Sequence, residues 1–287
     1  MLLAALDWHI LWQRIFHPDH VFVLALWRTI YISVLAQLLG VALGLIFAFM
    51  RMSRFLPLRL LSGLYVLIFR GTPLIVQIFF VYFGANLLFG FNLIPRTVNF
   101  GLFHMDGAAF AGIVALGLNE GAYMREIIRA GIDAVDKGQM EAAKSLGMPH
   151  RIAMRRVVLP QATRFIIPPL GNEFNSMMKN SSLVFFIGVT ELFGDAEIRY
   201  STTFKPVEYF LAVAFWYLVL TSVWSVIQAQ IERKLAVSER GDELSFRERV
   251  FEAWAPVSAW GRGARFHDPW KATNAAPRYS AGNWLPV

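Results

Sequence analysis

Long runs of apolar residues are the feature that most constrains what this chain of 287 residues can fold into. A run of roughly 20 mainly apolar residues is long enough to cross a bilayer as a helix. We place such spans at about residues 21–50, 60–88, 108–128, 165–189 and 207–231. Continuous runs favour helices over a membrane barrel, whose strands alternate apolar and polar residues. We therefore expect an all-α integral membrane protein with five transmembrane helices.

The composition agrees with a membrane location and excludes several kinds of site. The chain is 56% hydrophobic and only 16% charged, whereas about 25% charged residues is typical of a soluble domain. It has no cysteine, which excludes a disulfide framework and a thiolate metal site. The histidines show no metal-ligand spacing, and no GxxxxGK[ST] phosphate loop is present. We therefore expect a non-catalytic protein with no metal and no cofactor of its own.

The segments around the spans differ in character. Residues 1–20 lack the basic start before a short apolar core that marks a cleavable signal peptide. They are expected to form an amphipathic segment lying in the membrane interface, because their apolar residues recur at helical spacing: Trp8, Leu11, Trp12 and Ile15. Residues 89–107 are rich in glycine, asparagine and proline and are expected to form a loop. Residues 235–287 are polar and are expected to be a largely disordered cytoplasmic tail.

The charges between the spans predict the orientation of the chain. Basic residues without acids follow the first span, and the long connection at 133–163 is also rich in lysine and arginine. The connection after the fourth span is instead acidic, with Glu191, Asp195, Glu197 and Glu208. Because basic loops stay on the cytoplasmic side, we expect the N-terminus outside and the C-terminus in the cytoplasm. The basic charge lies beside membrane spans, so it does not call for a nucleic acid.

The segment from Glu141 to Pro160 is polar and basic although it lies between apolar runs. A helix is expected to begin near Gly138. A small apolar face on this helix is suited to docking against another protein, and it consists of Ala142, Ala143 and Leu146. Gly147 is placed to end this helix in the left-handed conformation, and Pro149 to begin a second one. Pro160 is expected to break or kink that second helix. From the residues alone, an ordinary basic cytoplasmic loop explains the segment equally well.

The fourth span carries a strip of polar side chains, which is costly in a membrane unless the strip faces protein or water. Its members recur at helical spacing or lie on the adjoining strip: Asn172, Glu173, Ser176 and Lys179. Such a strip can line a water-filled path, with the carboxylate facing an ammonium group and the lysine a carboxylate. The alternatives are a structural pair between Glu173 and Lys179, and hydrogen bonds between helices for Asn172 and Ser176.

Arg70 lies inside the second span, next to a helix break at Thr72 and Pro73. Broken helices occur at membrane depth where the backbone is buried in protein or lines a cavity. Arg70 is therefore a second candidate for the pathway, where its guanidinium would face a carboxylate. A structural ion pair with Glu120 or Glu173 is the alternative.

Several motifs, in the same order along the chain, resemble those of ABC-importer permeases. Glu141, Ala142, Ala143 and Gly147, followed by Val157-x-Leu159-Pro160, match the signature of the loop that couples these permeases to an ATPase, with Val157 where isoleucine is common. Further stretches are similar to permeases for polar amino acids, the histidine, arginine, glutamine and opine type: Phe69–Gln77, Asn119–Tyr123, Arg129–Ile132, Leu159–Ala162 and Lys179–Leu183. The resemblance covers about 21–234, and it departs from the family at Asn180, where aspartate is common.

The resemblance implies a role and a set of partners. It implies a permease subunit, in a bacterial inner membrane, of an ATP-driven importer for a polar amino acid or a derivative. ATP and Mg²⁺ would be bound by a separate ATPase dimer, which contacts the coupling residues named above. A second permease, either a copy or a paralogue, and an extracytoplasmic solute-binding protein would complete the assembly in the lipid bilayer. An ion-coupled secondary transporter or channel without an ATPase stays open as the alternative.

Overall fold

The computed structural model describes part of the chain, and within that part the fold is almost entirely helical. The described residues are 6–84, 87, 90, 94–95, 97–100 and 103–236. The chain divides into two compact units, of which the first is Met1–Val237. The expected tail at 235–287 therefore lies outside the described residues, apart from its first two positions.

Two helices begin the described chain. α1 (Trp8–Phe16) is capped by Asp7, and α2 (His20–Met52) is capped by Asp19, whose side chain accepts from a backbone N–H in the first turn of that helix. Aspartate is favoured at this position because its carboxylate satisfies N–H groups that the helix leaves free. α1 lies within the segment expected to be amphipathic, and α2 covers the span expected at 21–50.

The second apolar run is broken at Thr72 and Pro73, where the sequence predicted a helix break. It consists of α3 (Leu56–Gly71), α4 (Leu74–Phe79) and the π-helical turn η2 (Phe80–Gly84). α3 and the segment formed by α4 and η2 meet at an angle of 109° across the break at Thr72–Pro73. Proline causes the break because it has no N–H to donate to the preceding turn.

A β-hairpin lies inside the region that we expected to be an irregular loop. β1 (Thr97–Phe100) pairs antiparallel with β2 (Phe103–Asp106), with Thr97 opposite Asp106. The side chain of Asp106 also accepts from the backbone N–H of Ala109 at 2.6 Å, which caps α6 (Gly107–Asp133). The hairpin therefore leads directly into the third apolar helix.

The long basic connection is helical almost throughout. It contains α7 (Lys137–Ser145), α8 (His150–Ala153) and the π-helical turn η3 (Met154–Val158), and it runs on into α9 (Leu159–Asn180). Pro160 does not break the second helix, contrary to expectation. It lies in the first turn of α9, directly after η3, where a proline needs no N–H donor.

The end of the chain's described part contains a helix that the sequence did not predict. α9 is followed by the 3₁₀ helix η4 (Ser181–Ile187), and the acidic connection then forms α10 (Leu192–Thr203) before α11 (Pro206–Ala236). The fourth apolar segment is therefore an α-helix to Asn180 and a tighter helix beyond it. Gly188, at φ +93°, ends that helix in the left-handed region.

Glu191 is a buried structural residue rather than a solvent-facing charge of the acidic connection. Its side chain has no exposed surface. It accepts hydrogen bonds from Thr29 Oγ1 at 3.2 Å and from Tyr217 OH at 2.9 Å, and from the backbone N–H groups of Phe193 and Gly194. This carboxylate joins α2, α10 and α11, since each helix contributes at least one of its donors.

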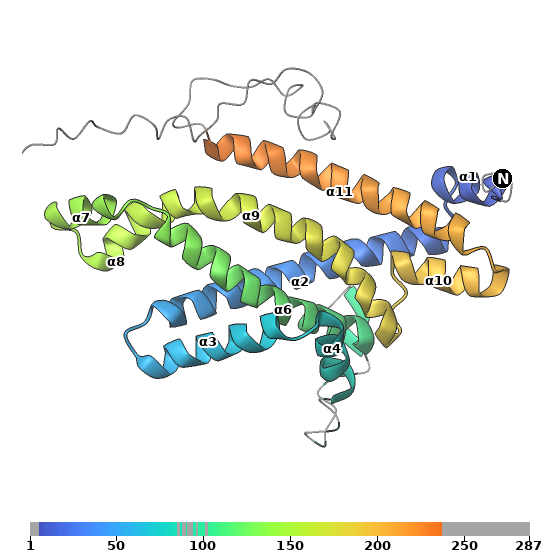
Figure 1. Ribbon diagram of the computed structural model, residues 1–287, viewed down its shortest axis with the longest axis horizontal. Coiled ribbons are helices and arrows are strands. Elements are labelled where there is room, and N and C mark those ends of the chain that lie inside the picture. The colour runs from blue at the N-terminus through green and yellow to red at the C-terminus, as the bar shows by residue number, and fades with distance from the viewer. Residues whose placement is uncertain are drawn as a thin grey trace, which may run out of the picture. The chain divides into compact units, whose positions relative to one another are not determined.

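α2 and α6 lie side by side and make the most extensive helix contact in the described chain (Figure 1). Glycines allow this close approach. A Cβ at Gly40 would lie 2.5 Å from the Cγ atom of Glu120, and a Cβ at Gly121 would lie 2.8 Å from the Cβ atom of Leu43. Small residues serve in this way where helices pack in membranes.

Two described helices, α2 and α11, are long and apolar enough to cross a bilayer, and the bent segment from α3 to η2 adds a third if it is one span. α6 and α9 are also long but more polar. α7, α8 and the α2–α3 turn lie at one end of this bundle, whereas α1 and α10 lie at the other (Figure 1). The helical membrane fold is thus confirmed at this level.

Candidate functional site

A pocket of about 410 Å³ lies where the α3–α4 break meets α6 and the end of α9. Three segments that are distant in sequence contribute to its wall. They place polar and charged groups beside a few apolar ones: Thr72, Pro73, Leu74, Asn119, Glu120, Tyr123, Glu173, Asn180 and Leu183. The pocket is therefore the place where most of the polar sequence motifs come together.

The two carboxylates of the pocket have different surroundings. Glu120 is only 4% exposed and accepts a hydrogen bond from Gln37 Nε2 at 3.0 Å. Glu173 is half-buried, and within the described part of the chain no hydrogen bond or ion pair to it is found, with Lys179 or with any other residue. Glu120 is thus held by the fold, whereas Glu173 is available to a bound molecule.

Arg70 supplies a positive charge at the same place. Its guanidinium lies over the ring of Tyr123, 5.0 Å from the ring centroid, and within electrostatic range of Glu173. A cation over an aromatic face is stabilised by the negative electrostatic potential of that face. The arrangement offers an anionic and a cationic group to one ligand, as a zwitterion requires.

The other candidates from the polar strip lie outside this pocket. Asn172 Oδ1 accepts from Gln228 Nε2 at 3.4 Å, and Ser176 Oγ donates to the backbone oxygen of Asn172 at 3.3 Å. Lys179 is exposed. Asn172 therefore makes a contact between α9 and α11 while it remains on the exposed side of α9, whereas the bond of Ser176 lies within α9 itself.

Sequence reasoning missed several residues of the pocket. Asn119 and Tyr123 were recognised as part of a motif but were not assigned to a site, and Leu74 and Leu183 were not singled out. The spacing of Asn119, Glu120 and Tyr123 on one helix was the available signal, since residues three and four apart share a face. Leu183 carried none, because its position depends on the turn from α9 into η4.

The helix predicted at the start of the coupling segment ends as expected. Gly147 has φ +78°. Its N–H donates to Lys144 O at 2.9 Å, and the N–H of Met148 donates to Ala143 O at 3.1 Å. This pair of bonds is typical of helices that end at a left-handed glycine. The angle between α7 and α8 is thereby fixed by backbone hydrogen bonds.

The exposed face of α7 differs from the predicted one at a single residue. Gly138, Glu141, Ala142 and Gly147 are exposed, and Leu146 is 81% exposed although it is apolar. Ala143 is 4% exposed, so it packs against its own chain and is not available to a partner. The face that α7 offers to another protein is therefore Glu141, Ala142 and Leu146.

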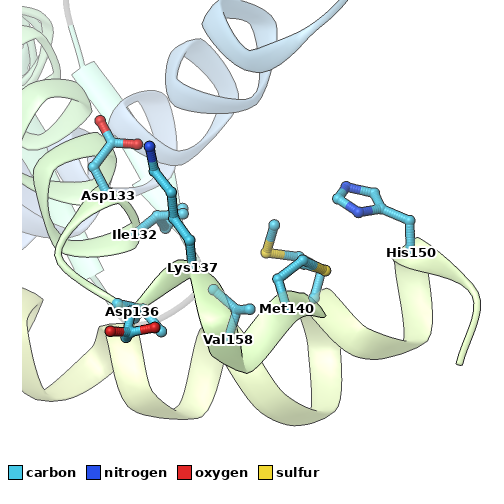
Figure 2. A pocket seen from close by; sticks show the side chains of 9 residues that line it. Ile132, Asp133, Asp136, Lys137, Met140, His150 and Val158 are labelled. Carbon is cyan, nitrogen blue, oxygen red and sulfur yellow. The ribbon is translucent and has the colours of Figure 1, made fainter. Parts of the chain in front are cut away.

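A second pocket, of about 580 Å³, lies between the end of α6, α7 and the α8–η3 segment. Figure 2 shows its apolar floor, with Met140 and Val158, and charged residues at its edge, with Lys137 and His150 on opposite sides. Its lining is Ile132, Asp133, Val135, Asp136, Lys137, Met140, His150, Met154 and Val158. One side of α7 thus borders this pocket, and its other side faces away from it.

At the opposite end of the bundle, ion pairs attach α1 to α10. Asp19 accepts from Arg14 Nη1 at 2.8 Å and from Arg199 Nη2 at 2.9 Å. Partial burial opposes the charge of Asp19, but the hydrogen bonds from Arg14 and from the backbone N–H of Phe22 outweigh it, so the pKa of this carboxyl lies below its ordinary value of 3.8. Asp19 therefore stays ionised and links the two arginines.

Comparison with known proteins identifies the family. Residues 40–237 match the model described as "Binding-protein-dependent transport system inner membrane component". The arginine transport system permease protein ArgU of Corynebacterium glutamicum is 42% identical over 236 residues, which are 79% of this chain and 71% of that protein. The probable amino-acid permease protein YxeN of Bacillus subtilis is 36% identical over 78% of this chain and 96% of its own length.

Solved structures agree. A crystal structure of an amino acid ABC transporter with histidines matches with a TM-score of 0.65 and 42% identity, over 75% of this chain and 94% of that one. The MetNI methionine ABC transporter in an inward-facing conformation matches with a TM-score of 0.62 at 16% identity, which shows the likeness of fold alone. The chain belongs to the family of binding-protein-dependent transport system inner membrane components.

Proposed function

We propose that this chain is the permease subunit of an ATP-driven ABC importer that moves a polar amino acid, or a derivative of one, into a bacterial cell. The observation that carries the proposal is a pocket lined by the carboxylate of Glu173, with the guanidinium of Arg70 beside it over the ring of the lining residue Tyr123. A zwitterionic amino acid has a complementary group for each. The names of the relatives, which are arginine and other amino-acid permeases, support the same class of substrate.

The proposed membrane topology has five spans, namely α2, the bent segment from α3 to η2, α6, α9 with η4, and α11. The N-terminus is outside, with α1 in the membrane interface, and the C-terminus is in the cytoplasm of this inner-membrane protein. Three exposed residues with apolar side chains support the placement of α1: Trp8, Trp12 and Phe16. The basic α2–α3 turn lies at the same end as α7, which supports a cytoplasmic location for both (Figure 1).

The proposed partners follow from surfaces that this chain leaves uncovered. An ATPase dimer, which binds ATP and Mg²⁺, docks on Glu141, Ala142 and Leu146 of α7, so this chain itself is not catalytic. A second permease, a copy or a paralogue, covers the polar side of α9, because Lys179 and Asn180 are exposed there and charged or polar groups facing lipid cost several kcal/mol. A solute-binding protein delivers the substrate from outside.

The alternative of an ion-coupled secondary transporter is less well supported. Such a protein has no need for a helix whose apolar residue Leu146 is 81% exposed at the end of an otherwise polar loop. Together with the exposed Ala142 beside it, Leu146 gives α7 a small apolar surface that a partner can cover. The geometry of α7 therefore favours a partner ATPase.

Co-expression of the chain with its encoded neighbours tests the proposal. We expect the chain to co-purify with an ABC ATPase, and ATP hydrolysis by the complex to rise when amino-acid-loaded binding protein is added. The substitution Leu146→Asp should abolish co-purification without reducing membrane insertion, because it places a charge in the centre of the docking face. A complex that assembles equally well with Leu146→Asp would contradict this role of α7.

A further inference from the structure

The helix break beside the pocket leaves backbone oxygens without their usual donors. In a continuous helix, Phe69 O would accept from the N–H of residue 73, but that residue is Pro73, which has none. Ile68 O instead accepts from Thr72 Oγ1 at 2.8 Å. An unsatisfied carbonyl is costly in a membrane protein, where water is not at hand to replace the donor.

Two side-chain amides replace the missing donors. Gln77 Nε2 donates to Phe69 O at 2.9 Å, to Thr72 O at 3.1 Å and to Thr72 Oγ1 at 2.8 Å. Asn119 Nδ2 donates to Phe69 O at 2.8 Å and to Gln77 Oε1 at 3.0 Å. Gln77 lies on α4, Asn119 on α6, and the oxygens belong to the end of α3. We call these two residues the amide clamp.

Gln77 of the amide clamp is buried, whereas Asn119 is half-buried and lines the pocket. Gln77 is 7% exposed, so its hydrogen bonds are protected from competition by solvent. One of the oxygens that it holds belongs to Phe69, whose neighbour Arg70 lies over the ring of Tyr123. Thr72, held by the same amide, lines the pocket itself. Loss of the clamp would therefore change the direction of the wall that carries Arg70.

We infer that Gln77 and Asn119 are positioning residues of the transport pathway, which fix the bend between α3 and α4 and through it the place of Arg70 beside the pocket, over the ring of Tyr123. Neither residue needs to touch the substrate for this role. The inference rests on the proposed function for its meaning in transport. The structural part of the inference, that two side-chain amides hold the bend, does not depend on which substrate is transported.

Spin labels at two exposed positions test the bend directly. The chain has no cysteine, so Leu60→Cys on α3 and Phe80→Cys after α4 give one label pair in the full-length protein in nanodiscs. We expect a narrow distance distribution in the parent, and a longer and broader one in Gln77→Leu and in Asn119→Leu, because the freed segment straightens. Gln228→Leu is the matched control. It removes an amide that donates to Pro168 O at 3.2 Å, far from the bend in sequence, and should leave the distance unchanged.

Transport by the assembled complex separates positioning from mere folding. With saturating substrate-loaded binding protein, we expect Gln77→Leu to lower ATP-driven uptake about tenfold. This factor corresponds to the free-energy cost of leaving about one buried carbonyl group without a hydrogen-bond donor. The amount of assembled complex and its basal ATP hydrolysis should stay unchanged. A structural defect alone would lower all three together.

The outcomes decide between the alternatives. An unchanged label distance in Gln77→Leu and Asn119→Leu, or in whichever of them inserts normally, overturns the inference, as does uptake that falls only in proportion to the amount of complex. If the parent complex shows no ATP-driven uptake, the proposed function fails instead, and the label distances still decide whether the amides hold the bend.

Discussion

At the scale of single residues, glycine is required at two places for different reasons. A Cβ at Gly44 would collide with Met124 and lie 2.9 Å from the backbone nitrogen of Arg125, so the requirement there is space between α2 and α6. A Cβ at Gly147 would meet nothing within 4 Å, but φ is +78°. The requirement at Gly147 is therefore conformational, which makes it possible to alter the coupling segment without disturbing the helix bundle.

Gly147→Val should uncouple the protein without unfolding it. The left-handed conformation costs a residue with a side chain roughly 1–2 kcal/mol, and more when it is β-branched. We expect the end of α7 to change direction, with normal membrane insertion but less bound ATPase and less transport, measured by co-purification and uptake. Gly63→Val is the control, since Gly63 has an ordinary φ and open space around it. Unchanged transport in Gly147→Val would remove the role given to this turn.

Glu173 is the residue at which a ligand role is most directly tested. Because no partner among the described residues holds its carboxylate, Glu173→Gln should leave assembly and basal ATP hydrolysis unchanged. Uptake should fall about tenfold or more, as expected when a hydrogen bond to a charged group is lost. The matched control is Glu232→Gln, whose carboxylate accepts from Gln228 away from the pocket. Equal uptake by Glu173→Gln and Glu232→Gln would show that Glu173 does not contact the substrate.

At the scale of elements, α1 depends on a few ion pairs. Asp19 joins Arg14 of α1 to Arg199 of α10, and Trp216 of α11 donates to the backbone oxygen of Arg14 at 3.2 Å. The pKa of Asp19 is lowered in the folded protein. Its contribution to the docking of α1 is therefore present above the ordinary pKa of 3.8 and is lost as the pH falls through the lowered value.

A spin label at Gln13→Cys, an exposed position on α1, should report this loss. We expect low mobility at neutral pH and a rise only at pH values below 3.8, as Asp19 takes up a proton at its lowered pKa. Asp19→Asn should already show the higher mobility at neutral pH. The same spectrum at neutral and at strongly acidic pH in the parent, with no effect of Asp19→Asn, would contradict the assignment.

The helices show which elements a sequence can predict here. Apolar periodicity and length located α1, α2, α6 and α11, because burial in lipid or against another helix demands a continuous apolar surface. The hairpin before α6 and the helix α10 gave no such signal. The prediction that Pro160 breaks the second helix was wrong for a specific reason. The π-helical turn η3 accommodates the missing N–H of the proline, so the helix continues.

The candidate site was predictable only in part, because the packing of the helices decides which side chains meet. Charge inside an apolar run singled out Arg70 and Glu173; Glu173 lines the pocket, and Arg70 lies beside it over the ring of Tyr123. Asn172, Ser176 and Lys179 share a helix with Glu173 but not the pocket, since the direction of α9 and its partner helices decide which face is enclosed. Gln77 holds the bend through bonds to backbone oxygens, and such bonds leave no pattern in a single sequence.

At the scale of the whole molecule, the described chain is a bundle whose two ends offer different surfaces. One end carries α7 with its exposed Leu146, and the other carries α1 and α10 joined by ion pairs (Figure 1). Between them, three polar residues of α9 are exposed: Asn172, Lys179 and Asn180. A single copy therefore lacks a complete wall around the pathway, and the proposed second permease supplies it.

Uptake by reconstituted proteoliposomes tests the central claim most directly. The chain is purified with its encoded ATPase, and with a second permease where one is encoded, and a radiolabelled polar amino acid is supplied outside with the binding protein. With ATP enclosed in the liposomes, we predict accumulation against a gradient, none without ATP, and less in Gly147→Val. Accumulation driven by a sodium or proton gradient in the absence of ATP would contradict the account.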